Sequence, residues 1–251
     1  MPILPEATEE ARRIVAEAAG RGLILRLLGG LAVRIHSPSA THRSLARAYP
    51  DLDFAYADKR GYRVEELMAE LGYAANRSFN LYNGDHRLLF YDDANQRQVD
   101  VFVGKFHMCH HVPFPAQRIM LEPLTLPVAE LLLTKIQIVQ MNDKDVRDIC
   151  ALLLDHPLGE GDNEMVNLPY ITGLCADDWG WWKTVTLNVR KVREASRAIA
   201  LEADSRERLE ERLAALERAL DQAPKSVRWR IRARVGERVP WYELPEEVKR
   251  G

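Results

Sequence analysis

The sequence feature that most constrains the fold of this chain is an apolar run that ends at two glycines. Residues 23–28 are apolar apart from Arg26, and Gly29 and Gly30 follow directly. The pattern predicts a buried strand, then a tight turn, then a helix that starts near residues 31–35. Glycines in such a turn let a phosphate approach the backbone closely, beside helix N–H groups that favour an anion. The segment therefore predicts a turn that accepts a phosphate.

Three aspartates lie in two other segments with the pattern of strands. Asp51 and Asp53 alternate with bulky apolar residues, so a strand would point both carboxylates to one face. Asp100 lies within the apolar residues 99–103, a second segment of the same kind. Three carboxylates at one sheet edge repel one another unless a hard cation lies between them, and Mg²⁺ prefers carboxylate oxygens. We therefore expect Asp51, Asp53 and Asp100 to hold Mg²⁺ or Mn²⁺.

A phosphate-accepting turn beside a carboxylate metal site is typical of phosphoryl or nucleotidyl transfer. The metal neutralises charge on the phosphates and activates the attacking oxygen. We expect Gly29 and Gly30 to let the triphosphate of an NTP approach. The polar spacer at residues 31–50 has two interpretations, a lining of the triphosphate channel or a solvated surface loop.

Two helical residues add charge to the predicted site. Residues 128–139 have the apolar stripe of a buried helix, and Lys135 lies inside that stripe. Such a lysine either extends out of the core or faces an anionic ligand such as a nucleotide phosphate. The next helix carries Asp145 and Asp148 one turn apart. Asp145 lies in the first turn, where an acid opposes the helix dipole favourably, but Asp148 lies deeper.

Taken in order, these motifs resemble the minimal nucleotidyltransferase superfamily, which includes DNA polymerase β and the aminoglycoside nucleotidyltransferases. The shared order is Gly-Gly, then Asp-x-Asp, then a lone Asp in an apolar strand, and the similarity covers roughly residues 22–155. Within the superfamily, the run Leu-Leu-Leu-Thr-Lys with a downstream Lys-Asp-Val-Arg-Asp resembles the branch of the AbiE-type toxins (AbiEii-like). The resemblance implies that Lys135 and Asp148 belong to the active site, with Asp145 as second choice.

The same resemblance implies the fold class, α+β. A polymerase β-like nucleotidyltransferase domain, with a small mixed twisted sheet and helices, would occupy residues 1–156, and a mainly helical C-terminal domain would occupy residues 157–251. The turn-rich residues 156–162 place this boundary. Periodicity predicts helices at 6–20, 62–71, 165–176, 179–201 and 205–223, and strands at 78–82 and 87–91, with an Asn-Gly hairpin turn after the first strand.

Four arginines alternate with apolar residues near the C-terminus. This period of two predicts a strand with one basic face, made by Arg228, Arg230, Arg232 and Arg234. Such a face suits the phosphates of RNA, and equally suits a solvated edge guarded by charge. The resemblance implies that the acceptor is a tRNA 3′ end, that the role is that of a toxin and that a cognate antitoxin is a partner.

Composition limits the setting of the protein. The formal net charge of −2 gives no general sign of a nucleic-acid partner. The N-terminus has no signal pattern, and no apolar run approaches the ~18 residues of a membrane span, so no membrane partner is expected. The three cysteines are widely spaced and fit a reducing compartment. These features predict a cytoplasmic protein.

Together, these features predict a metal-dependent nucleotidyltransferase that transfers a nucleoside monophosphate from an NTP to an acceptor hydroxyl. Asp51 and Asp53 would hold the metals, and Asp100 would complete the site and help to deprotonate the acceptor. Lys135 would neutralise the triphosphate, and Asp148 would orient Lys135. Two alternatives stay open. In one the acceptor is a small molecule or a protein, and in the other the protein is catalytically inactive and binds a nucleotide or a partner.

Overall fold

The computed structural model describes residues 3–244 of this mixed α+β chain. The chain packs as two compact units. Unit 1 contains Met1–Ile35, Ala48–His107 and His111–Pro127, and unit 2 contains His36–Arg47, Met108–His110 and Val128–Gly251. The predicted division at residues 156 and 157 concerns domains that fold separately. These packing units do not test that division, so it stays a prediction.

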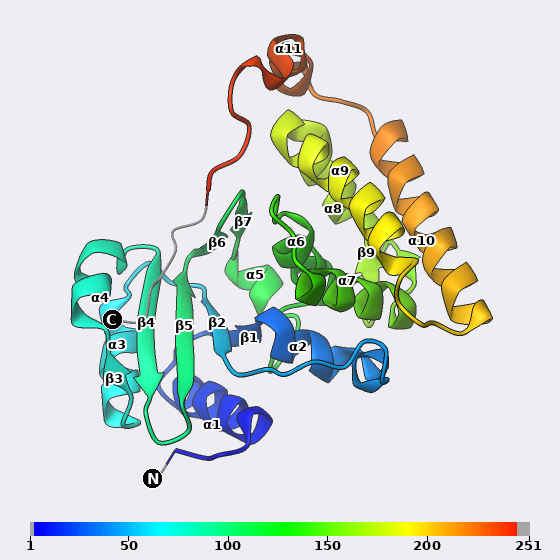
Figure 1. Cartoon of the computed structure of the whole chain (residues 1–251). Coiled ribbons are helices and arrows are strands. Elements are labelled where there is room, and N and C mark those ends of the chain that lie inside the picture. The colour runs from blue at the N-terminus through cyan, green and yellow to red at the C-terminus, as the bar shows by residue number, and fades with distance from the viewer. Residues whose placement is uncertain (1–2, 245–251) are drawn as a thin grey trace. The chain divides into compact units, whose positions relative to one another are not determined.

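Unit 1 is built on a five-stranded mixed sheet (Figure 1). The strands lie in the order β1-β2-β5-β4-β3, and β2 is parallel to β5 whereas the other neighbours are antiparallel. Leu27, Phe54 and Val101 are fully buried on the central strands, as the apolar runs predict. The strands are β1 (Leu25–Leu28), β2 (Leu52–Tyr56), β3 (Ala74–Ala75), β4 (Arg87–Asp92) and β5 (Arg97–Val103).

Helices and a small hairpin complete unit 1. The helix α1 begins and ends close to the predicted residues and buries Ala11, Ile14 and Ala18 completely. A helix follows β1 as predicted, but α2 begins at Gly29, so the two glycines form its first residues and no separate turn precedes it. The elements are α1 (Ala7–Gly20), α2 (Gly29–His36), α3 (Tyr62–Glu70), α4 (Arg77–Asn83), α5 (Ala116–Ile119), β6 (Lys105–His107) and β7 (His111–Pro113).

The strand predicted at residues 78–82 is wrong, because this segment forms the helix α4. The side chain of Asn76 accepts a hydrogen bond from the Phe79 N–H at 3.1 Å and so caps the first turn. Gly84 ends the helix, so the Asn-Gly pair is a helix terminus and not a hairpin turn. A cap three residues before Phe79 decides the conformation here, and it outweighs the turn signal of Asn83-Gly84.

Unit 2 is mainly helical. Its helix α10 buries Leu209, Leu213, Leu216 and Leu220, the stripe that the sequence places on one face. None of the helices within residues 3–244 is long and apolar enough to span a bilayer. The elements are η1 (Pro38–Thr41), α6 (Val128–Ile136), α7 (Asp143–Asp155), β8 (Leu158–Gly159), β9 (Val166–Asn167), α8 (Leu168–Asp177), α9 (Trp179–Ser196), α10 (Ala203–Gln222), α11 (Val227–Val235) and η2 (Gly236–Arg238).

The spacer between the glycine turn and Asp51 is held by hydrogen bonds. The main-chain N–H and the hydroxyl of Ser39 donate to the carboxylate of Asp155 at 2.8 and 2.6 Å. The hydroxyl of Ser44 donates to the Ala200 carbonyl at 2.5 Å. Residues 36–47 therefore pack as part of unit 2 and are not a free solvated loop. A lining role toward a triphosphate stays a prediction.

The arginine-rich strand is also wrong, because residues 227–235 form the helix α11. Ser226 caps its start by accepting from the Trp229 N–H at 3.1 Å, and Gly236, with φ +60°, follows its last residue. These caps fix nine residues as a helix although their apolar pattern has a period of two. Helical spacing also splits the predicted basic face, since Arg228 and Arg232 share one side and Arg230 and Arg234 another.

Candidate active site

The structure brings two of the three predicted carboxylates together on the sheet. Asp53 of β2 and Asp100 of β5 are register partners on adjacent parallel strands. Register partners in neighbouring strands point to the same face, with the strands about 4.8 Å apart. Asp51 precedes β2 by one residue and is exposed, and Asp53 is half-buried. Because Asp51 lies outside β2, the strand period does not fix its side chain, and its predicted place beside Asp53 stays a prediction.

The glycine turn lies directly against this pair of carboxylates. Leu28, the last residue of β1, is the register partner of Asp53. The next residue, Gly29, has φ +73°, and a Cβ built on it would lie 2.1 Å from Oδ2 of Asp53. Only glycine fits this position, both because of the backbone conformation and because of the contact. Gly30 follows as a buried residue in the first turn of α2.

Asp100 is buried and already accepts hydrogen bonds at both oxygens. Its Oδ1 accepts from Nε of Arg87 at 2.8 Å and forms an ion pair with Nη2 at 2.8 Å, and its Oδ2 accepts from the side-chain amide of Gln98 at 2.8 Å. We did not predict Arg87 as part of the site. The antiparallel register of β4 with β5 pairs Leu89 with Asp100, so Arg87, two residues away, shares that face. A correct pairing of the two predicted strands would have identified it.

The carboxylate cluster has the donor set that Mg²⁺ or Mn²⁺ requires. Asp53 supplies carboxylate oxygens in contact with Gly29, and Asp51 adds a carboxylate two residues earlier in the chain. Asp100 offers Oδ2, whose partner is a neutral amide, whereas Oδ1 is paired with the guanidinium of Arg87. The residues therefore fit a hard divalent cation, with Asp51 and Asp53 as its principal ligands.

Lys135 forms a second charged cluster, within unit 2. Its Nζ lies 2.9 Å from Oδ2 of Asp148 and 3.5 Å from Oδ1 of Asp145, and its side chain is only 14% exposed. Burial disfavours the charged form of Lys135, but attraction to Asp148 and then Asp145 outweighs burial, so the pKa of Lys135 is raised above its usual value. The lysine is therefore held as a buried cation.

Arg47 is the member of this cluster that the motifs did not identify. Its Nε and Nη2 donate to the two oxygens of Asp148 at 2.8 and 2.7 Å, a bidentate pair. Asp148 thus carries two cations, while Asp145 also closes a capping box with Asn142 at the start of α7. In the sequence, Arg47 stands only as one basic residue of a polar spacer, and no spacing connects it to Asp148.

Each of the two units thus contains one of the predicted groups of site residues. Asp51, Asp53 and Asp100 belong to unit 1 with the glycine turn, and Lys135 and Asp148 belong to unit 2. The contact between Lys135 and Asp148 agrees with the expected orientation of the lysine by the aspartate. The catalytic roles of these residues stay predictions.

Comparison with solved structures gives a structural likeness. No protein-family model matches the chain, and no curated protein matches it. The chain is similar to the solution structure of the antibiotic-resistance factor ANT(2'')-Ia, an aminoglycoside nucleotidyltransferase, with 15% identity and a TM-score of 0.40. The match covers 85% of this chain and 97% of that one. The function is therefore inferred from the chain's own residues.

Proposed function

We propose that the chain is a divalent-metal-dependent nucleotidyltransferase. One observation carries this proposal. The Gly29 turn, with φ +73°, contacts the carboxylate of Asp53, which is the register partner of Asp100 on a parallel neighbouring strand. A glycine main chain without a side chain of its own and a set of carboxylate ligands for a hard cation therefore meet at one place. Nucleotidyl transfer requires both in contact with the same triphosphate.

In the proposed reaction, an oxygen of the acceptor hydroxyl attacks the α-phosphorus of an NTP. A new bond forms between that oxygen and the α-phosphorus, the bond from the α-phosphorus to the bridging oxygen breaks, and pyrophosphate leaves. A bound divalent cation neutralises charge on the phosphates and activates the attacking oxygen. Asp51 and Asp53 hold the cation, and the turn at Gly29 and Gly30 admits the phosphates. The proton of the acceptor hydroxyl passes to a carboxylate oxygen of Asp100. That oxygen must first release the group that it now pairs with, Arg87 at Oδ1 or Gln98 at Oδ2.

Lys135 supplies a positive charge in this proposal. Its raised pKa keeps the ammonium group charged at neutral pH, because Asp148 and Asp145 outweigh the cost of burial. Arg47 pairs with the same oxygen atoms of Asp148 that would otherwise serve Lys135 alone. A carboxylate shared in this way neutralises each cation only in part, so Lys135 retains attraction for an anion such as a triphosphate.

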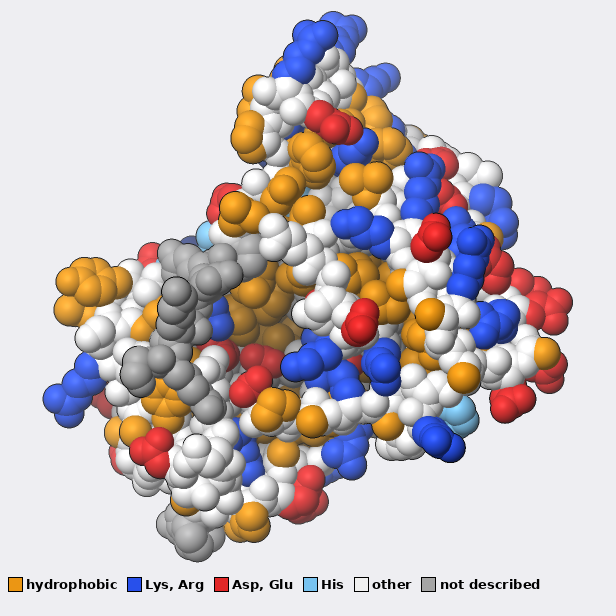
Figure 2. All heavy atoms as spheres, in the orientation of Figure 1, with side chains coloured by type: hydrophobic (Ala, Val, Ile, Leu, Met, Phe, Trp, Pro, Cys, Tyr) orange, Lys and Arg blue, Asp and Glu red, His pale blue; other side chains and the backbone are white. Residues whose placement is uncertain are grey.

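The acceptor distinguishes the remaining forms of the proposal. For an RNA acceptor, such as a tRNA 3′ end modified by a toxin with a cognate antitoxin, we propose Arg230 and Arg234 as phosphate contacts. Both are exposed and lie one turn apart on α11. Arg232 instead donates to the carbonyls of Gly236 and Val239, so it serves the end of the helix. Figure 2 shows basic side chains gathered at α11.

The test is transfer of label from each of the four α-labelled NTPs, with Mg²⁺, to total RNA or to aminoglycosides. We expect transfer by the wild type and loss of it in Asp53→Ala. The variant Asp93→Asn, which alters an exposed aspartate in the turn before β5, serves as the control and should retain activity. Label transfer that survives Asp53→Ala would refute the mechanism. Loss of transfer to RNA alone in Arg230→Gln/Arg234→Gln would identify RNA as the acceptor.

One observation favours an alternative, a catalytically inactive nucleotide-binding protein. The guanidinium of Arg87 already neutralises Asp100, one of the three carboxylates expected to hold the cation. In an inactive protein, this ion pair would replace the metal permanently. Binding of NTP without turnover of any acceptor, together with binding that is equal with and without Mg²⁺, would support this alternative.

A further inference from the structure

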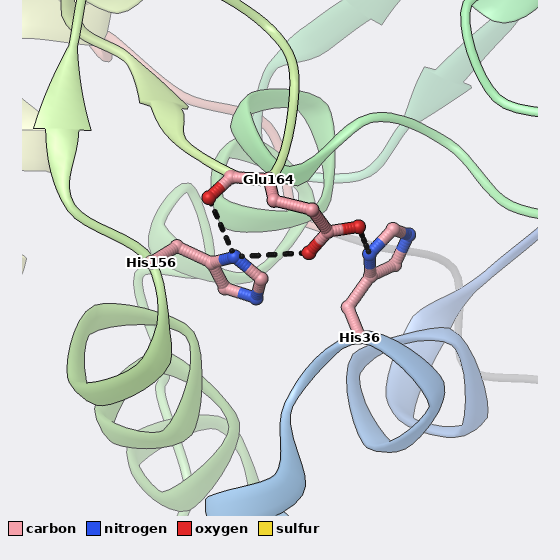
Figure 3. Close-up of side chains that lie close together, drawn as sticks. All are labelled: His36, His156 and Glu164. Atoms are coloured by element: carbon pink, nitrogen blue, oxygen red, sulfur yellow. Dashed lines mark hydrogen bonds and ion pairs between the residues drawn. The ribbon is translucent and has the colours of Figure 1, made fainter.

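We infer that His36, His156 and Glu164 form a binding site for a transition-metal ion of the Zn²⁺ class. This site is separate from the carboxylate cluster and does not depend on the proposed function. All three residues belong to unit 2. His36 is the last residue of α2, His156 directly follows α7, and Glu164 lies in the connection between β8 and β9 (Figure 3).

The three side chains converge at the spacing of metal ligands. One ring nitrogen of each histidine and one carboxylate oxygen of Glu164 all lie within 4.8 Å of one another. Figure 3 shows the carboxylate between the two imidazoles. Oε1 of Glu164 lies 3.3 Å from Nδ1 of His36, and Oε2 lies 3.4 Å from Nδ1 of His156. The 3.3 Å between Oε1 of Glu164 and Nδ1 of His36 matches the separation of about 3.3 Å between neighbouring ligands of a tetrahedral zinc ion with bonds of about 2.0–2.1 Å. A charge-assisted hydrogen bond would be about 2.7–2.9 Å long.

A second observation concerns the tautomer of His156. Its Nδ1 lies 3.1 Å from the main-chain carbonyl oxygen of Glu164, which can only accept, so Nδ1 carries the proton. The other nitrogen, Nε2, then has the lone pair, and it is buried without a hydrogen-bond partner in the described part of the chain. The side chain of His156 is 3% exposed. A buried lone pair with no donor is a destabilising feature that a bound cation removes.

The hydrogen bond at Nδ1 is itself typical of a metal-bound histidine. Such histidines almost always donate their other N–H to a carboxylate or to a backbone carbonyl, which fixes the orientation of the ring. Glu164, in contrast, is 58% exposed, so its carboxylate is able to move onto an ion that enters from solvent. The site therefore combines one fixed ligand, His156, with one mobile ligand, Glu164.

The donor set selects the type of metal. Imidazole nitrogens with one carboxylate suit Zn²⁺ and related transition-metal ions, whereas Mg²⁺ prefers oxygen ligands alone. Two neutral imidazoles and one carboxylate leave the site one negative charge before an ion binds. Three protein ligands leave a fourth position for water or a further ligand. A bound ion would connect the end of α2 to the segment after α7.

The test is a calorimetric titration of the metal-stripped full chain with Zn²⁺ in excess Mg²⁺, repeated in Asp53→Asn to remove a carboxylate of the other cluster. We expect one equivalent of Zn²⁺ to bind in both proteins and to raise the melting temperature. Glu164→Gln should weaken Zn²⁺ binding by at least about tenfold. Glu160→Gln, an exposed glutamate of the same connection, should leave it unchanged.

A second variant keeps the result independent of folding. His156 is buried, so its replacement risks unfolding, whereas His36→Gln keeps a polar side chain of similar size. Co²⁺ gives an independent readout, since a tetrahedral site with nitrogen ligands produces strong visible absorption. Absence of a bound equivalent in the wild type would overturn the inference. Equal Zn²⁺ affinity in Glu164→Gln, His36→Gln and the wild type would overturn it as well.

Discussion

At the scale of single residues, Gly29 carries the strictest requirement. Its φ of +73° and the 2.1 Å approach of a built Cβ to Asp53 leave no room for a side chain. We expect Gly29→Ala to lower the free energy of unfolding by roughly 1–3 kcal/mol. Because the displaced carboxylate is the proposed metal ligand, the proposed nucleotidyl transfer should fall about 100-fold.

Gly20→Ala is the matched control for that substitution. Gly20 is the last residue of α1, and a Cβ built there meets no atom within 4 Å. Alanine is favoured over glycine in a helix, so stability should stay the same or rise slightly. Denaturant titration and the label-transfer assay measure the two effects. Wild-type transfer rates in Gly29→Ala would contradict a role of this turn at the phosphate.

Arg87 gives a second prediction at the residue scale. It pairs with the buried Asp100, so Arg87→Gln leaves that carboxylate without its cation. We expect the free energy of unfolding to fall by roughly 3–5 kcal/mol, as for other broken buried ion pairs. Because Mg²⁺ restores positive charge at the same carboxylate, Mg²⁺ should stabilise the variant more than the wild type.

Thermal unfolding with and without Mg²⁺ measures this difference. Arg60→Gln removes an exposed ion pair with Asp58, which solvent screens, so it should leave the melting temperature and its Mg²⁺ dependence nearly unchanged. An equal Mg²⁺ effect in Arg87→Gln and the wild type would show that Asp100 contacts no metal.

At the scale of elements, α11 depends on its cap. The helix has nine residues, none of them buried, so packing contributes little to it. Ser226→Ala removes the hydrogen bond to Trp229 and should cost about 1 kcal/mol. Hydrogen exchange of the α11 amides should then accelerate about fivefold, whereas Ser205→Ala in α10 should have no such effect. Unchanged exchange in Ser226→Ala would mean that packing, and not the cap, holds this helix.

A helix or strand was predictable from the sequence where its apolar periodicity agrees with its capping and turn residues. Where the two indicate different structures, the prediction was wrong. The strand β5 and the helix α2 follow directly from their apolar runs and glycines, and the pairing of Asp53 with Asp100 follows from two similar strands. The helix α11 was missed because its alternation of arginine and apolar residues fits a strand, while the deciding signals are Ser226 and Gly236. Periodicity alone does not decide between a helix and a strand when capping residues indicate a helix and the alternating pattern indicates a strand.

The candidate site shows the same limit for contacts that are distant in the chain. The carboxylates expected to bind the cation were chosen by residue type and spacing, and their roles stay predictions. Arg47 and Arg87 were not, because each is an ordinary surface residue type until folding places it against Asp148 or Asp100. The number of residues between a buried acid and the arginine or lysine that pairs with it follows no fixed pattern in the sequence. Such partners become visible only with the register of the strands and the packing of the helices.

At the scale of the whole molecule, stability should fall at alkaline pH. Burial raises the pKa of the Cys150 thiol from 9.0 to about 12, and the pKa of Cys175 likewise to about 12. The folded state keeps these protons, so their contribution is fully present below pH 9 and is lost as the pH rises toward 12. Each thiol should lower the free energy of unfolding by up to about 1.4 kcal/mol per pH unit in this range.

Lys135 contributes to the same alkaline loss at higher pH, because its pKa is raised from 10.5 and its ion pairs need the charged form. Cys150→Ala isolates the part that belongs to one thiol. Denaturant unfolding between pH 8 and pH 11 should show a smaller slope in Cys150→Ala, and a smaller one again when Cys175→Ala is added. Identical slopes in the three proteins would mean that neither thiol ionises on unfolding.

The central claim is that Asp53 and its register partner Asp100 hold a divalent cation together with a nucleotide, and it can be tested without knowledge of the acceptor. Electron paramagnetic resonance measures Mn²⁺ bound to the full chain with and without a non-hydrolysable NTP analogue. We expect the analogue to tighten Mn²⁺ binding in the wild type and in Asp93→Asn, and we expect Asp53→Asn to weaken that binding by at least about tenfold. Nucleotide-dependent Mn²⁺ binding of equal strength in Asp53→Asn and the wild type would contradict the claim.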